Sequence, residues 1–328
     1  MPKTIVVIGA TGNQGGSVAR TFLQLPAGAD SWHVRAVTRS PSSPAAASLA
    51  AAGASLVRAS LDDPASLRAA FAGAHAIFAV TDPLAIIASG GDAPEDPEEV
   101  MAWAGGAETR QLRNVADAAA EVDGLERLVL STLQDAERWS GGRYKAVHHF
   151  TGKARAEAYV REAHPALWAR TSTYLPGWFL RGVLPGGPGA PQKAEDGTLL
   201  FAPGIESDTR VPVFAPEEDA GPLVLALVRE PAGGKRVLGQ RASMRFSEFL
   251  ALFAATTGQK TGYVAWPTDE EQLPMPVFLR RPLVEMCAFW DEFGYVGGDE
   301  SVTLPEDLTY PPVFETVAQY LEKHDWNY

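Results

Sequence analysis

The fold is decided by the stretch Gly9-Ala10-Thr11-Gly12-Asn13-Gln14-Gly15, near the start of the 328-residue chain. An apolar run over residues 4–8 precedes it, and a helical pattern over residues 14–25 follows it. A glycine turn between a buried strand and a helix is typical of dinucleotide-binding units: the first glycine permits the tight turn, the second lets the backbone approach a pyrophosphate, and the third allows close helix packing. The sequence therefore predicts a phosphate-binding loop whose contacts come from Gly9, Thr11, Gly12, Asn13, Gln14 and Gly15.

The residues after the second predicted strand indicate which dinucleotide is bound. The chain reads Val37-Thr38-Arg39-Ser40 there, without the carboxylate that binds the adenosine ribose in an NAD site. A guanidinium at this place pairs with the 2′-phosphate that distinguishes NADP. We therefore predict NADP(H) as the cofactor, with Arg39 on its 2′-phosphate. The alternative is that Arg39 is an ordinary solvated side chain.

The first half of the chain alternates short apolar runs with helical patterns, as repeated βαβ units do. Strands are predicted over residues 4–8, 33–38, 55–57, 76–80, 127–130 and 167–173, and helices over residues 14–25, 44–52, 64–71, 107–122 and 153–162. After Tyr174, proline and glycine interrupt the pattern more often. We expect an α/β fold, a Rossmann-type doubly wound parallel sheet, with an NADP(H)-binding domain over residues 1–173. A smaller C-terminal substrate lobe is expected over residues 174–328, with part of it returning to the sheet.

Composition argues against several classes of protein. The formal net charge of −12 and the lack of a Lys/Arg cluster disfavour nucleic-acid binding. No apolar run approaches the roughly 20 residues that cross a bilayer, so no membrane is expected. Cys287 is the single cysteine, and no spacing of histidine and cysteine is typical of a metal site. We expect a cytoplasmic protein with neither an internal disulfide nor a catalytic metal.

Further motifs make the chain resemble the NmrA-like family, in particular its fungal branch. These motifs are Phe78-Ala79-Val80-Thr81-Asp82, Ser131-Thr132-Leu133, Ser140-Gly141-Gly142-Arg143-Tyr144, His148-His149-Phe150-Thr151-Gly152-Lys153 and Glu157-Ala158-Tyr159-Val160. The resemblance spans nearly the full chain and implies a Rossmann domain with a small C-terminal lobe. The family contains NADP(H)-dependent reductases of quinones, phenolic ethers or enones, and also nucleotide-sensing regulators that bind a partner protein. In one departure, Ala59-Ser60 stands where the family commonly carries a Gly-Asp pair near the adenine.

Cofactor contacts are also expected on the nicotinamide side. Thr81 and Asp82 close the fourth predicted strand, where they would approach the nicotinamide ribose; the alternative is a turn that opens at Asp82-Pro83. The run Tyr174-Leu175-Pro176-Gly177 resembles the family's segment that passes over the nicotinamide. Tyr174, Pro176 and Gly177 are therefore predicted cofactor contacts, unless the run is only a proline-glycine bend.

The usual proton donor of short-chain dehydrogenases is missing. Those enzymes use a Tyr-x-x-x-Lys pair on one helix face, and the matching residues here are His149 and Lys153. The resemblance implies that Lys153 still contacts the ribose. Reduction of a carbonyl or enone requires a donor at the oxygen. The catalytic candidates are Lys153, His149, Thr132 and Tyr144, with Ser131 beside Thr132. His149, which titrates near neutrality if unperturbed, is either this donor or a structural histidine.

Residues 88–106 read as an insertion that is longer than usual for the family. Its central part, residues 90–99, is acidic and poor in core-forming residues, and the segment follows the fourth predicted strand. We expect a mobile lid with Met101 and Trp103 on its inner face.

The sequence predicts an NADPH-dependent reductase of an apolar aromatic or polyketide-like small molecule, such as a quinone, enone or ketone of secondary metabolism. Two alternatives stay open. One is an NADP(H)-sensing regulatory protein without turnover that binds a partner protein, and the other is a cofactor-retaining isomerase or dehydratase. A closed apolar pocket against the nicotinamide favours the reductase.

Overall fold

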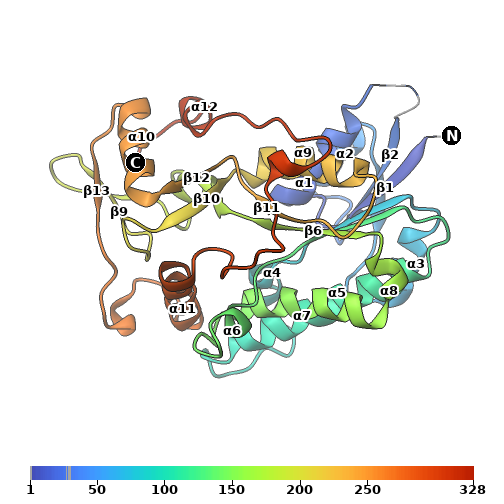
Figure 1. Ribbon diagram of the computed structural model, residues 1–328, viewed down its shortest axis with the longest axis horizontal. Coiled ribbons are helices and arrows are strands. Elements are labelled where there is room, and N and C mark those ends of the chain that lie inside the picture. Colours follow the sequence, from blue (N-terminus) through green and yellow to red (C-terminus); the bar gives the residue numbers. More distant parts are fainter. Residues whose placement is uncertain (1, 27, 29–30) are drawn as a thin grey trace.

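A parallel sheet forms the centre of the molecule (Figure 1). Within residues 2–26, 28 and 31–328, which the computed structural model describes, this sheet has seven strands in the order β11-β6-β5-β4-β1-β2-β3. The strands are β1 (Lys3–Val7), β2 (Trp32–Thr38), β3 (Ser55–Arg58), β4 (Ala76–Ala79), β5 (Arg127–Ser131), β6 (Thr171–Pro176) and β11 (Arg236–Gly239). The strand order reverses between β1 and β4, and doubly wound folds bind ligands outside the carboxyl ends of the strands at such a point.

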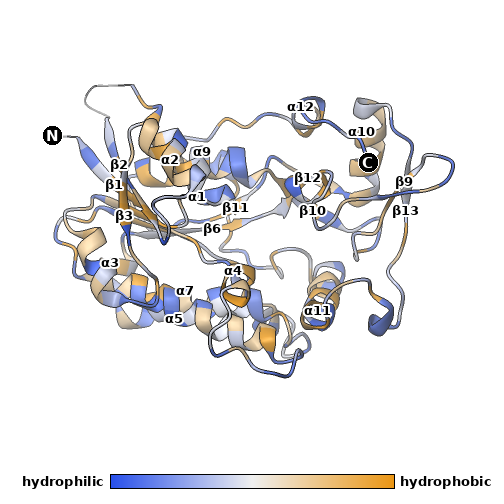
Figure 2. Cartoon of the chain, turned by 180° about the vertical axis from the view of Figure 1, so that it is seen from behind, coloured by the Kyte–Doolittle hydropathy of each residue, from blue (hydrophilic) through white to orange (hydrophobic). Residues whose placement is uncertain are grey.

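Helices cover both faces of the sheet (Figure 1). On one face lie α1 (Asn13–Leu23), α2 (Pro44–Ala51) and α9 (Pro216–Arg229), and on the other lie α3 (Pro64–Phe71), α5 (Val100–Ala120), α7 (His148–Ala163) and α8 (Pro165–Trp168). Strand β1 shows why both faces are covered: Ile5 and Val7 pack in one core cluster, whereas Val6 and Ile8 pack in the other. The hydrophobic colouring of the strands in Figure 2 agrees with this two-sided burial. In the part of the chain that the structure describes, no helix is both long and apolar enough to cross a bilayer.

The C-terminal half builds a lobe around two small three-stranded sheets, β12-β10-β7 and β13-β9-β8. Its strands are β7 (Trp178–Phe179), β8 (Gln192–Lys193), β9 (Leu199–Phe201), β10 (Arg210–Phe214), β12 (Ala242–Arg245) and β13 (Thr261–Tyr263). Its helices are α10 (Phe246–Thr257), α11 (Val277–Phe293) and α12 (Val317–Glu322). Meanwhile α9 packs on α1, and β11 pairs with β6, so part of this half belongs to the main sheet. The division expected between residues 173 and 174 falls inside β6.

The lid prediction for residues 88–106 is wrong. Helix α5 begins at Val100 rather than at residue 107, so the last part of the expected lid is helical. Met101 is buried, and Trp103 packs beside Ile86 of a short helix, α4 (Pro83–Ala88), that the sequence did not predict. Residues 89–99 stay outside regular structure and do not line the cavity described below. The neighbouring residues 83–86 line it instead, because Asp82 caps α4 and starts that helix at the end of β4.

The strand predicted over residues 167–173 begins too early. Residues 165–168 form helix α8, with Pro165 at its first position, and the strand starts at Thr171. Leu167 is apolar because it is buried in the core on this helix, which is why periodicity alone assigned it to the strand. A short helix α6 (Ala136–Trp139) follows β5.

Candidate active site

A cavity of about 950 Å³ connects the glycine loop with the C-terminal lobe. One end is lined by residues 8, 9 and 11–15 after β1, by residues 37–40 at the end of β2, and by residues 59–62 after β3. The middle is lined by residues 80–86 after β4, by Ser131 at the end of β5, and by His149 and Lys153 of α7. The far end lies in the lobe. The cavity therefore runs along the carboxyl edge of the sheet, as expected for a dinucleotide site in this fold.

The glycine loop leaves room for a ligand and offers it hydrogen-bond donors. Gly9 has a φ of +70°, and a Cβ at Gly15 would lie 2.2 Å from the carbonyl oxygen of Gly9. No side chain of the residues that the structure describes caps the start of α1. Among the described residues, nothing accepts a hydrogen bond from the backbone N–H groups of Asn13, Gln14 or Gly15. Unpaired N–H groups and the helix dipole favour an anion at this point, so the loop fits a pyrophosphate.

The adenosine end of the cavity carries Arg39 as an exposed side chain. No carboxylate of the described residues forms an ion pair with it, which leaves its guanidinium available to a phosphate. Asp62 also lines this end, and its carboxylate accepts two hydrogen bonds from Nε2 of Gln111, at 3.2 and 3.1 Å. The sequence reasoning missed Asp62 because it looked for the family's aspartate at the position of Ser60.

Lys153 lies in a buried ion pair that the sequence reasoning also missed. Its ammonium group contacts the carboxylate of Glu108, which is fully buried on α5, and donates to Thr81 Oγ1 at 3.1 Å. Helices α5 and α7 can approach closely here because Gly152 has no side chain. A Cβ at this position would lie only 2.5 Å from the carbonyl oxygen of Gly105. The one feature of the sequence that could have indicated this ion pair is the position of Glu108 among the apolar residues of α5. An ammonium group has three donors, so one remains for a ligand at the cavity that Lys153 lines.

Of the remaining predicted cofactor contacts, three line the cavity and one does not. Asp82 lines the cavity, but its carboxylate accepts hydrogen bonds from the N–H groups of Leu84 and Ala85. Pro176 and Gly177 line the cavity as well. Tyr174 does not: it is fully buried in the sheet, and its hydroxyl donates to Gln14 Oε1. Tyr174 therefore reaches a ligand only through another side chain.

His149 faces the cavity with one ring nitrogen. Its Nδ1 is enclosed without a partner, whereas Nε2 is not enclosed, and the residue lines the cavity. Burial, together with the charges of Lys153 and His148, lowers the pKa of His149 to about 3. The ring is therefore perturbed and does not titrate near neutrality, because the imidazolium form is poorly solvated here. A buried N–H without an acceptor is costlier than a buried lone pair, which favours the neutral tautomer that carries its proton on Nε2.

The other candidate donors do not reach the cavity with a free hydroxyl. Thr132 is buried with its Oγ1 enclosed and lies outside the cavity lining. Tyr144 also lies outside it, and its hydroxyl donates to Glu292 at 2.8 Å. Ser131 lines the cavity, but its hydroxyl donates to Gln14 Oε1 at 2.8 Å. Of these side chains, only His149 offers an uncommitted donor.

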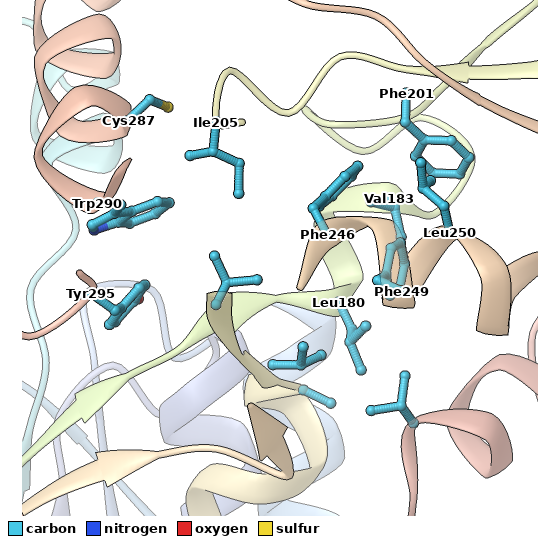
Figure 3. Close-up of a cluster of buried hydrophobic side chains, with 14 of the residues drawn as sticks. Leu180, Val183, Phe201, Ile205, Phe246, Phe249, Leu250, Cys287, Trp290 and Tyr295 are labelled. Atoms are coloured by element: carbon cyan, nitrogen blue, oxygen red, sulfur yellow. The ribbon is translucent and has the colours of Figure 1, made fainter. Parts of the chain in front are cut away.

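The lobe end of the cavity is an apolar chamber. Its walls include Trp178, Phe201, Phe246, Trp266, Met275, Leu283, Met286, Cys287, Trp290 and Tyr295. In Figure 3, Cys287 and Trp290 on α11 lie opposite Ile205 and Phe246. Among the described residues, no Asp, Glu, Lys or Arg lines this end. The sequence did not predict these walls, since nothing local distinguishes a cavity wall from a packed interior.

A doubly wound sheet with a glycine loop and an anion-accepting helix start defines a Rossmann-type dinucleotide-binding protein, here with an adjoining apolar chamber. The chain belongs to the NmrA-like family, whose profile matches residues 1–321.

The chain is similar to an NmrA-like family domain-containing oxidoreductase, FrzB, from Cladobotryum sp., with 32% identity over 278 residues that cover 80% of this chain and 76% of the relative. A second such relative, hkm9 from Aspergillus hancockii, is 31% identical over 80% of this chain and 76% of its own length. These relationships make the chain an oxidoreductase of this family.

Solved structures agree with the fold. The negative transcriptional regulator NmrA in complex with NADP superposes with a TM-score of 0.72 at 23% identity, over 98% of this chain and 90% of NmrA, and NmrA has also been solved with NAD. An NADPH-dependent quinone oxidoreductase from Escherichia coli, solved with NADPH, superposes with a TM-score of 0.64 at 18% identity over 98% of both chains. At these identities the likeness concerns the fold.

Proposed function

We propose that the protein is an NADPH-dependent reductase of an uncharged, apolar aromatic or polyketide-like carbonyl compound, such as a quinone, enone or ketone. The observation that carries this proposal is the single cavity that continues from the glycine loop into the aromatic chamber. A regulator that only senses a dinucleotide needs no such chamber. The curated relatives named as oxidoreductases and the NADPH-dependent quinone oxidoreductase of the same fold support the same class of reaction.

The cofactor would be held by groups along the carboxyl edge of the sheet. The N–H groups at the start of α1 would bind the diphosphate, Arg39 the 2′-phosphate, and the free donor of Lys153 the nicotinamide ribose. When bound, NADPH supplies a hydride, and the second hydrogen needed for reduction comes as a proton from water. The carboxylate of Glu108 orients the ammonium group of Lys153, and both side chains are buried.

His149 acts on the substrate oxygen in this proposal. Its neutral ring donates a hydrogen bond from Nε2 to the oxygen on which negative charge develops. A neutral imidazole suits this task because it stabilises the charge without first having to bind a proton. The apolar walls hold the ring system of the substrate and exclude charged compounds.

The test of the reductase is NADPH oxidation by the purified protein with a panel of quinones, enones and aryl ketones. We expect turnover on apolar members of the panel and little on carboxylated analogues, because a carboxylate would enter the chamber without a partner. NADPH binding with no oxidation by any member would favour the sensing regulator. Conversion of a compound without net NADPH oxidation would favour the isomerase or dehydratase.

Cofactor selection provides a separate prediction. We expect Arg39→Ala to weaken NADPH binding by about tenfold or more and to leave NADH binding nearly unchanged, because charge-assisted hydrogen bonds contribute roughly 1.5–3 kcal/mol. Dissociation constants from fluorescence titration measure this. Arg113→Ala is the matched control, since Arg113 is an exposed arginine of α5 outside the cavity. Equal affinities of the unmodified protein for NADPH and NADH would refute the role of Arg39.

A further inference from the structure

Gln14 lines the cavity, and its side chain connects three elements that are far apart in the sequence. It is the second residue of α1, and its side chain reaches Ser131 at the end of β5 and Tyr174 in β6. Strand β6 lies two places from β4 on the side of the sheet opposite β2 and β3. The carboxamide therefore extends from the diphosphate loop toward the nicotinamide half of the expected binding site.

Both hydroxyls donate to the same atom. Ser131 Oγ donates to Gln14 Oε1 at 2.8 Å, and the hydroxyl of Tyr174 donates to that oxygen from the other strand. Tyr174 is fully buried between Phe78 and Phe214, whose rings lie 6.3 and 6.2 Å from its own, so its hydroxyl cannot turn elsewhere. The two hydrogen bonds hold the carboxamide with its oxygen toward the sheet.

The amide nitrogen is left for a ligand. Gln14 Nε2 has no partner among the described residues and is not enclosed by protein, and Gln14 lines the cavity. A primary amide carries two N–H donors, and here the arrangement of the oxygen directs both away from the sheet. The chemistry that satisfies them is an acceptor oxygen, of a phosphate or of a ribose hydroxyl.

We propose that Tyr174 and Ser131 are positioning residues that orient the carboxamide of Gln14 toward an acceptor oxygen in the nicotinamide half of the dinucleotide. This inference rests on the proposed function, in that it assumes a dinucleotide in this cavity. It replaces direct contact between Tyr174 and the cofactor with an indirect role. Because the proposed hydrogen bond from Gln14 goes to the nicotinamide half, it should contribute to the binding of NADPH but not to the binding of a ligand that contains only the adenosine half.

The experiment compares the affinities for NADPH and for 2′,5′-ADP, which lacks the nicotinamide half. Tyr174→Phe removes one hydroxyl from an otherwise intact ring, and we expect it to weaken NADPH binding by about threefold to tenfold, the value of a typical hydrogen bond. Binding of 2′,5′-ADP should stay unchanged. Gln14→Ala should weaken NADPH binding at least as much, and Tyr174→Phe should add little in the Gln14→Ala background, because the two residues act as one unit.

Tyr159→Phe is the matched control, since it also removes a tyrosine hydrogen bond, to Asp117 of α5 at 2.7 Å, but outside the cavity lining. Its affinity for both ligands should equal that of the parent. Equal weakening of NADPH and 2′,5′-ADP by Tyr174→Phe, or additive effects in the double variant, would overturn the inference, since general loss of packing gives those results. Unchanged NADPH affinity in Tyr174→Phe would overturn it as well. A parent protein that binds neither ligand would overturn the proposed function itself, and the inference with it.

Discussion

His149→Phe is expected to lower kcat by about 10²–10³, because removal of one preorganised donor to a developing oxyanion has an effect of this size. The affinity for NADPH should change little, because the proposed partner of His149 is the substrate oxygen and not the cofactor. His149→Gln retains an N–H donor and should recover part of the rate. Steady-state kinetics on the best substrate of the parent, together with NADPH titration, measure both effects.

His148→Gln is the matched control, because His148 is the adjacent histidine and lies outside the cavity lining. The pH dependence separates the two chemical roles of His149. A histidine that releases a proton near its ordinary pKa would make kcat fall between about pH 5 and 8. Because the pKa of His149 is lowered to about 3, the ring is neutral throughout that range, and kcat should show no inflection from it. Near-normal turnover in folded His149→Phe would make the residue structural.

Glu108→Ala is expected to lower the free energy of unfolding by about 3–5 kcal/mol, the usual cost of leaving one member of a buried ion pair without its partner. In this variant the ammonium group of Lys153 would keep only its hydrogen bond to the hydroxyl of Thr81. The side chains of Lys153 and Glu108 are both nearly inaccessible to water, so water could not replace the lost carboxylate well. Denaturant unfolding monitored by circular dichroism measures the change. Glu108→Gln should cost less, because its amide oxygen still accepts a hydrogen bond.

Glu121→Ala is the matched control for this pair. Glu121 immediately follows α5 and pairs with Arg68, but both side chains are about half exposed, so its loss should cost far less stability than the loss of Glu108. The double variant Glu108→Leu, Lys153→Met removes both charges and should be more stable than Glu108→Ala. A Glu108→Ala protein as stable as the Glu121→Ala protein would show that the buried pair contributes little to folding.

Local patterns predicted the Rossmann half of this protein well. The glycine loop, five of the six predicted strands and the positions of Arg39 and Lys153 follow from signals that a short stretch contains: a turn that only glycine allows, an apolar run or a helical period. The errors arose where local signals are ambiguous. Residues 100–106 were assigned to a lid because they follow an acidic loop. They instead form the first turns of α5, where Trp103 and Ala104 pack against α4.

The sequence by itself determined most strands of the Rossmann half, the glycine loop and the family to which the chain belongs, because each depends on residues close together along the chain or on motifs that can be matched directly. Tertiary structure alone decided the site's chemistry. Glu108 meets Lys153 across 45 residues, Tyr174 meets Gln14 across 160, and Trp290 of α11 lines the same chamber as Trp178 and Phe201. The pKa of His149 likewise depends on burial. Burial, charge pairing and cavity shape arise only when distant segments pack together, and no local pattern specifies them.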